Sequence, residues 1–361
     1  MNDNTVAVDS IIYGSFVKKT KLESLTLNAF SNTSIASATE LNIFIDLYSV
    51  LKSIFSEHHR TRINNYTDIT SCIINMCSHY RSFFKSLSVR TKFFIVFSFN
   101  TCDINRKFVA DYNSSFLKKS QIPLFNKLAM DNFDLLNILC PYLPDIFFIK
   151  STRNYESAVI IANLIETLND RNPNLIISKD LYQLQLCTLY PYTSYLYPIK
   201  KRCNGQSMDE SIMISISEKP SFRTEFWNLV GLVRKINGYK LYDISPINFP
   251  LFNALYKFPE RNILPSANII TARNIIYDMV GSNDIKIVPE QLYHNDFINN
   301  NLAPALIESK LKALDVQFML PFYKSDPESS AINLDNLQDD ATVNMINSKF
   351  FQSNPLDLSK L

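Results

Sequence analysis

Three acidic residues, Asp46, Glu156 and Asp180, stand at positions where a parallel sheet would bring them to one edge. Asp46 directly follows one apolar run, Asp180 follows another, and Glu156 opens a helical stretch after a third. Ligands of parallel α/β proteins sit beyond the carboxyl ends of the strands. Carboxylate oxygens are the ligands that hard divalent cations such as Mg²⁺ prefer. The positions of these three acids therefore predict a metal-binding site.

The elements that must position these acids are short apolar runs separated by helical periodicity. The runs cover residues 41–45, 93–97, 146–149 and 175–177, and the helical patterns between them cover 47–57, 66–87, 123–139 and 155–168. Continuous apolar strands alternating with helices are typical of a parallel sheet that is covered on both faces. We therefore expect an α/β fold with a central, mainly parallel sheet flanked by helices.

The rest of the chain predicts additional segments around this domain. Residues 1–40 read as an N-terminal extension, 41–260 as the α/β domain, 261–325 as a helical C-terminal region and 326–361 as a polar tail. Residues 203–222 turn polar, which predicts a surface loop, and 223–236 read as a helix whose apolar face places Trp227 in the core.

Several motifs resemble one known family. Asp46 ends the first strand, Glu156-Ser157-Ala158-Val159 opens a helix, and the most specific stretch is Ser178-Lys179-Asp180-Leu181-Tyr182-Gln183-Leu184. In order and spacing, these motifs resemble the flap endonuclease and 5′-to-3′ exonuclease family, which has a PIN-like fold and includes the N-terminal nuclease domain of bacterial DNA polymerase I. The resemblance covers residues 41–240.

The resemblance implies roles for individual residues. Asp46, Glu156 and Asp180 correspond to metal ligands of the family, which uses two divalent ions to hydrolyse a phosphodiester. The same resemblance implies that Arg106, Tyr112 and Lys179 contact nucleic acid.

The departures from the family pattern affect its metal ligands and its phosphate contacts together. Ser98, Ala158, Val159 and Ser178 stand where the resemblance places aspartates. Residues 231–238 contain no carboxylate where the family carries several, and Asn113 replaces an expected lysine. We therefore predict a degraded site with no catalytic residue and no cofactor, in which the three remaining acids are vestigial metal ligands.

Each remaining acid also has a structural explanation. Asp46 and Asp180 precede helices, where an aspartate N-cap contributes about 1 kcal/mol. Glu156 lies in a first helical turn, where the helix dipole favours a negative charge.

Three functions stay open at this point. The first is a catalytically inactive protein that acts as a binding or architectural subunit of a nucleic-acid-processing or viral assembly. The alternative is a divergent 5′-nuclease that holds one Mg²⁺ or Mn²⁺ and cleaves branched or nicked DNA. The third is DNA binding without cleavage.

The composition narrows the class of protein without choosing among these functions. Of 361 residues, 46% are hydrophobic and 19% charged, which is typical of a globular protein. A net charge of +2 gives no global argument for nucleic acid. The abundance of Asn, Ile, Lys, Phe and Tyr is what an AT-rich genome favours.

No apolar run reaches the roughly 18 residues of a membrane span. The six scattered cysteines predict buried free thiols, and hence an intracellular, cytoplasmic protein, in a host cell if it is viral.

The C-terminal tail contains apolar residues in a polar setting. The stretch Phe350–Leu361 is similar to peptides that dock on sliding clamps, with Gln352, Leu356 and Leu358 as candidate partner-binding residues. A tail that packs back onto its own domain is the other reading. We expect one or more protein partners, with DNA as a possible further partner and no membrane.

Overall fold

The computed structural model describes residues 38–51, 67–98, 103–110, 122–150, 155–168, 171–203, 206–214, 221–234, 236, 241–256 and 267–326. Several predicted features lie outside these residues. They are most of the 1–40 extension, Tyr112, and the tail that carries Gln352, Leu356 and Leu358.

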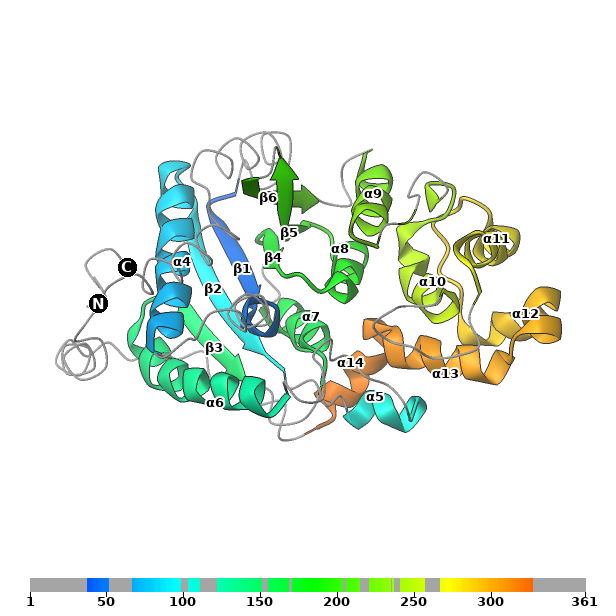
Figure 1. The fold of residues 1–361 in the computed structure, drawn as a ribbon, viewed down its shortest axis with the longest axis horizontal. Helices are drawn as coiled ribbons and strands as arrows, with labels where there is room; N and C mark the ends of the chain where they lie inside the picture. Colours follow the sequence, from blue (N-terminus) through cyan, green and yellow to red (C-terminus); the bar gives the residue numbers. More distant parts are fainter. Residues whose placement is uncertain are drawn as a thin grey trace.

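Among the described residues, six strands form one sheet in the order β3-β2-β1-β4-β5-β6 (Figure 1). They are β1 (Glu40–Asp46), β2 (Arg90–Phe97), β3 (Ile146–Lys150), β4 (Asn174–Ile177), β5 (Thr193–Cys203) and β6 (Gln206–Ile214). Neighbouring strands from β3 to β5 are parallel, and β6 runs antiparallel to β5. The predicted α/β fold with a mainly parallel central sheet is confirmed.

Successive residues of the central strands point into two different hydrophobic cores. Phe44 lies in the core on one face, whereas Ile43 and Ile45 lie in the core on the other. Phe44 stacks on Phe94 of β2 at 5.1 Å between ring centroids, and Phe94 stacks on Phe147 of β3 at 5.2 Å. Because both faces are buried, the strands can be apolar throughout, which explains why continuous apolar runs predicted them.

Helices cover both faces of the sheet. The helices α4 (Thr67–Ser86) and α6 (Ile122–Leu139) pack on one face, and α7 (Ser157–Leu168) packs on the other (Figure 1). Short elements complete this half of the fold: α5 (Asp103–Phe108), η2 (Cys140–Tyr142), η3 (Leu181–Gln185) and α8 (Leu186–Leu189). Residues 47–51 form the described part of the helix predicted at 47–57.

The prediction of a surface loop at 203–222 is wrong for most of that segment. β6 occupies Gln206–Ile214 and forms a hairpin with β5, in which Tyr195 is opposite Ile214. The strand begins with polar residues at the edge of the sheet, so its sequence lacks the apolar run that marked the central strands. Backbone pairing with β5, which sequence periodicity does not report, holds it in the sheet.

The helices that follow β6 pack on the sheet domain and share a core with it. Within the segment 41–260 they are α9 (Phe222–Arg234), η5 (Pro246–Asn248) and α10 (Phe249–Leu255). Within the segment 261–325 they are α11 (Ile269–Val280), η6 (Pro289–His294), α12 (Asp296–Asn301), α13 (Pro304–Leu314) and α14 (Val316–Lys324). Their buried residues belong to the same hydrophobic cluster as α7. Trp227 is buried as predicted, and its indole N–H donates a 2.9 Å hydrogen bond to the carbonyl oxygen of Ile244.

Cys77, Cys140 and Cys187 are free and buried, as predicted for these three. Burial raises the pKa of the Cys77 thiol to about 12, so this group is protonated at neutral pH. Among the helices that the structure describes, none has both the length and the hydropathy that a bilayer span requires.

Candidate functional site

The carboxyl ends of β1 and β4 place Asp46 beside Ser178. Ile45 is the register partner of Ile177, so the residues that follow them emerge next to each other at one edge of the sheet. The Ser178 hydroxyl donates a 2.7 Å hydrogen bond to Oδ2 of Asp46. The Ser49 hydroxyl, one helical turn after Asp46, donates to the same oxygen at 2.7 Å. The two hydroxyl oxygens lie 3.0 Å apart, so the three side chains form one buried hydrogen-bonded group.

The Asp46 carboxyl is unusually enclosed for an acid, since only 1% of the residue is exposed. Burial raises the pKa of this carboxyl, and the negative charge of Asp180 raises it further. The hydrogen bonds from Ser178 and Ser49 act in the opposite direction and lower the pKa. Oδ1 of Asp46 is buried without a hydrogen-bond partner among the described residues. The site therefore holds a desolvated carboxyl with one oxygen satisfied by two serines.

Asp180 caps the short helix that follows β4, as the sequence predicted. Its Oδ1 accepts a 3.0 Å hydrogen bond from the backbone N–H of Tyr182. The backbone N–H of Asp180 donates to the Ser178 hydroxyl at 2.9 Å. Ser178 thus connects the cap to Asp46 and fixes the turn at the end of β4.

The end of β2 is tied to the start of α7. The Ser98 hydroxyl, which follows β2, donates a short hydrogen bond to the carbonyl oxygen of Tyr155. Tyr155 immediately precedes Glu156, which is 4% exposed and accepts the first backbone hydrogen bonds of α7 from Val159 and Ile160. Glu156 therefore stands directly before the helix, one position earlier than the predicted first turn.

The structure thus brings Asp46, Ser178 and Asp180 together. It places Ser98 directly after β2 and Glu156 directly before α7, and the Ser98 hydroxyl joins the two elements through the carbonyl oxygen of Tyr155. Within the described ranges, no three His, Cys, Asp or Glu side chains are grouped so that they could hold a metal ion. Of the predicted nucleic-acid contacts, Arg106 is exposed on α5 and Lys179 is half-buried beside Asp180. Their roles stay predictions.

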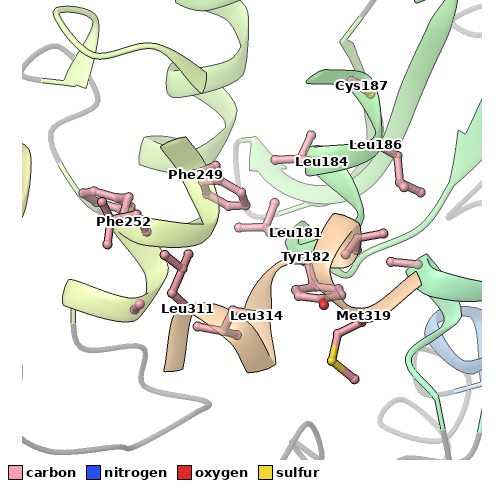
Figure 2. Packing of buried hydrophobic residues seen from close by; sticks show 14 of the residues in the cluster. Leu181, Tyr182, Leu184, Leu186, Cys187, Phe249, Phe252, Leu311, Leu314 and Met319 are labelled. Carbon is pink, nitrogen blue, oxygen red and sulfur yellow. The ribbon is translucent and has the colours of Figure 1, made fainter. Parts of the chain in front are cut away.

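The stretch after β4 is packed against the C-terminal helices. Leu181, Tyr182 and Leu184 lie in a hydrophobic cluster with residues of α10, α13 and α14 (Figure 2). The Gln185 amide donates to the carbonyl oxygen of Leu314 at 3.2 Å and accepts from the backbone N–H of Val316 at 2.9 Å. Gln185 therefore satisfies the backbone on both sides of the α13–α14 junction.

Two other elements of the candidate edge also contact the C-terminal helices. On α5, the Asn105 amide donates a 2.7 Å hydrogen bond to the carbonyl oxygen of Ala313. The Tyr155 hydroxyl, just before α7, donates to the carbonyl oxygen of Phe322 at 3.2 Å. Ala158 and Val159 are fully buried in the core that α7 shares with α14.

Sequence reasoning missed Ser49, Gln185 and Asn105 as parts of this site. A signal for Ser49 was present, because a residue three positions after Asp46 lies on the same face of the helix that follows β1. Asn105 and Gln185 bond to backbone groups more than 100 residues away in the sequence, and no local pattern reports such contacts.

Comparisons with known proteins address the fold. No family profile matches the sequence, and neither does any curated protein. The solved structure of the T5 D15 protein co-crystallized with metal ions is similar with a TM-score of 0.51 and 12% identity, covering 86% of this chain and 98% of that chain.

Two further solved structures match with lower scores. A bacteriophage T5 D15 flap endonuclease complex with DNA and metal ions has a TM-score of 0.49 and 15% identity, over 81% of this chain and 94% of that chain. The catalytic core of Rad2 in complex with DNA substrate has a TM-score of 0.41 and 13% identity, over 92% of this chain and 94% of that chain.

The likeness to the D15 protein extends over most of both chains at low identity, so it concerns the fold alone. The chain has a flap-nuclease-like, PIN-like α/β fold.

Proposed function

We propose that this protein is a catalytically inactive member of the flap-nuclease-like fold that serves as a binding or architectural subunit of a nucleic-acid-processing or viral assembly. The observation that carries the proposal is the state of Asp46. Its Oδ2 accepts hydrogen bonds from two serine hydroxyls, and one of them, Ser178, stands where the family resemblance expects an aspartate. This oxygen of the carboxylate is satisfied by protein donors.

The side chains at this edge do not fit a pair of divalent ions. Such ions need several anionic oxygen ligands to offset their charge. Asp46 is one carboxylate with an oxygen already engaged, Asp180 uses its Oδ1 to cap a helix, and the Ser98 hydroxyl is turned to a backbone carbonyl. Each group has a partner that stabilises the fold in the absence of a metal.

Packing on α7 supports the same conclusion. Ala158 and Val159 stand where the resemblance places two aspartates, and both are fully buried in the core that includes Met319 and Tyr323 of α14. An unpaired carboxylate at either position would be strongly destabilising. Apolar packing between α7 and α14 thus occupies the positions at which the resemblance expects two acids.

The surface between α11 and α12 suits a protein partner. Of the ten exposed large apolar residues in the described ranges, six fall between residues 270 and 297: Ile270, Tyr277, Ile285, Val288, Tyr293 and Phe297. Ile270 and Tyr277 are seven positions apart on α11, so they share one face of the helix. Exposed apolar residues concentrated in one segment are typical of interaction sites.

The charges of this segment indicate what kind of partner it would bind. Asp278, Glu290 and Asp296 are exposed and form no ion pair with any described residue. The cations nearby are already paired, since Arg273 contacts Asp243 and Lys286 contacts Asp315. Free carboxylates beside apolar side chains repel phosphate and match a protein segment in which lysine or arginine flanks apolar residues.

The partner can be tested by affinity purification from the native source with matched variants. Tyr277→Glu and Phe297→Glu should lose a protein that the wild type retains, while Met130→Glu, at an exposed apolar residue of α6, should keep it. Unchanged melting temperatures would show that the variants are folded. Equal recovery of every associated protein with all three variants would contradict this surface assignment.

The alternative function, a divergent nuclease with one Mg²⁺ or Mn²⁺, is favoured by a single observation. Oδ1 of Asp46 is buried and lacks a partner among the described residues, and Asp180 adds to the local negative charge. A cation at this position would bind Oδ1 of Asp46 and offset the negative charge of Asp180. This function predicts metal-dependent cleavage of a 5′-flap or nicked duplex that Asp46→Ala abolishes.

DNA binding without cleavage is a separate outcome. It predicts affinity for branched DNA that falls steeply as the salt concentration rises. Absence of binding even at low salt would exclude it.

A further inference from the structure

A cavity of about 370 Å³ lies at the amino-terminal edge of the sheet, the edge opposite to Asp46. Its walls come from the end of α4, the turn that leads into β2 and the turn that precedes β3. This volume is in the range of pockets that hold small molecules. Neither the family resemblance nor the proposed function assigns a role to this part of the molecule.

The charged side chains that line this cavity are mostly cationic. Arg81, Lys85 and Arg90 line it together with one carboxylate, that of Asp145. The Arg81 guanidinium is held in place, because it donates a 2.6 Å hydrogen bond to the carbonyl oxygen of Pro144 and lies over the ring of Phe93. A positioned guanidinium loses little freedom when it binds an anion.

The other two cations have charge available for a ligand. Lys85 is exposed and forms no ion pair with any residue that the structure describes. Arg90 pairs with Glu40 at 2.7 Å, but Glu40 also pairs with Lys92 at 3.0 Å, so two cations share one carboxylate. Four cations against two carboxylates leave about two positive charges at this edge.

A buried hydroxyl in the wall supplies an independent indication of a ligand. Thr91 lines the cavity and is 2% exposed, yet its Oγ1 has no hydrogen-bond partner among the described residues. Buried hydroxyl groups almost always have a partner, because an unpaired one loses its hydrogen bonds to water without replacement. A ligand oxygen that reached this hydroxyl would accept the missing hydrogen bond.

We propose that this cavity binds the phosphate monoester group of a small organic molecule. A phosphate monoester carries about −1.5 to −2 charge at pH 7 and presents three acceptor oxygens. That charge matches the excess at the cavity, and the oxygens match the Arg81 guanidinium, the Lys85 ammonium and the Thr91 hydroxyl. The cavity has room for an organic portion beside the phosphate.

The test uses ribose 5-phosphate and adenosine 5′-monophosphate as probes, with inorganic phosphate and adenosine for comparison, in isothermal titration calorimetry on the full chain. Both esters should bind the wild type, and adenosine should not. Lys85→Glu and Thr91→Val should each weaken ester binding about tenfold or more, because each removes a donor to a charged group.

The control is Lys107→Glu, which makes the same charge change in the last turn of another helix, α5, and should leave the affinity unchanged. Binding should also weaken below about pH 6, where the phosphate takes up its second proton. Failure of both esters to bind would overturn the proposal. So would binding of inorganic phosphate alone, or an equal loss of affinity in Lys107→Glu. None of these outcomes depends on whether the opposite edge cleaves DNA.

Discussion

The Ser178 hydroxyl donates a 2.7 Å hydrogen bond to Oδ2 of Asp46 across neighbouring parallel strands, at the sheet edge where parallel α/β proteins bind their ligands. Ser49 donates to the same oxygen. The two serines hold the Asp46 carboxyl within the hydrogen-bonded framework of the fold.

Replacement of Asp46 by asparagine should make the protein more stable at neutral pH. The folded-state pKa of Asp46 is raised, so the folded protein holds this proton to a higher pH than the unfolded chain does. The stability that Asp46 contributes is therefore present at acid pH and is lost as the pH rises from about 4 through the folded pKa. Asp46→Asn should match the wild type at low pH and exceed it increasingly as the pH rises through the folded-state pKa of Asp46.

The measurement is the free energy of unfolding by urea across the pH range. Asp134→Asn, at an exposed aspartate of α6, serves as the control and should show no such trend. A difference between Asp46→Asn and the wild type that does not change with pH would contradict the account of a desolvated carboxyl.

Restoration of an aspartate at position 178 should destabilise the protein. Ser178→Asp places a second carboxylate against buried Asp46, and an uncompensated buried charge costs about 3–5 kcal/mol. Ser178→Ala adds no charge, but it removes a donor to Asp46 and leaves the Asp180 N–H without its partner, so it should cost about 1–3 kcal/mol. Addition of Mg²⁺ or Mn²⁺ should raise the melting temperature of Ser178→Asp and leave that of the wild type unchanged. A metal-induced rise of similar size in the wild type would contradict the proposed loss of the metal site.

Replacement of Gln185 should lower the free energy of unfolding, although Gln185 is not one of the predicted metal-binding or nucleic-acid-binding residues. Gln185→Ala leaves the carbonyl of Leu314 and the N–H of Val316 without their side-chain partner, and each lost partner costs about 1–3 kcal/mol. Urea unfolding should show the loss, and hydrogen exchange should locate it at the Val316 amide. Glu290→Ala, at an exposed residue of η6, is the control. Unchanged exchange at Val316 would show that Gln185 does not hold the α13–α14 junction.

Local sequence patterns predicted the sheet because its central strands are buried on both faces. Residues 41–45 and 93–97 are almost entirely apolar, and the position of Asp46 and Ser178 directly after apolar runs predicted that both lie at the carboxyl edge of the sheet. β6 was missed, since its first half is polar and backbone pairing with β5 determines its structure. The contacts of Gln185 could not be predicted, because its partners lie 129 and 131 positions away.

The capping role of Asp180 was predictable from its place before a helix, and the structure confirms it through the bond from the Tyr182 N–H. The sequence also showed that Ala158 and Val159 are apolar where the family resemblance expects acids. It did not show what packs against them, because the α14 helix that shares their core begins more than 150 residues later, at Val316. Tertiary packing between distant segments is the part that a single sequence does not report.

Cleavage of DNA tests the central claim most directly. A 5′-flap duplex is incubated with the wild type in the presence of Mg²⁺ or Mn²⁺, beside Asp46→Ala purified in the same way to measure contaminating nuclease. The hydrogen-bonded state of Asp46 predicts no cleavage by the wild type above the Asp46→Ala background. Metal-dependent cleavage by the wild type that Asp46→Ala abolishes would contradict the account and establish the protein as an active nuclease.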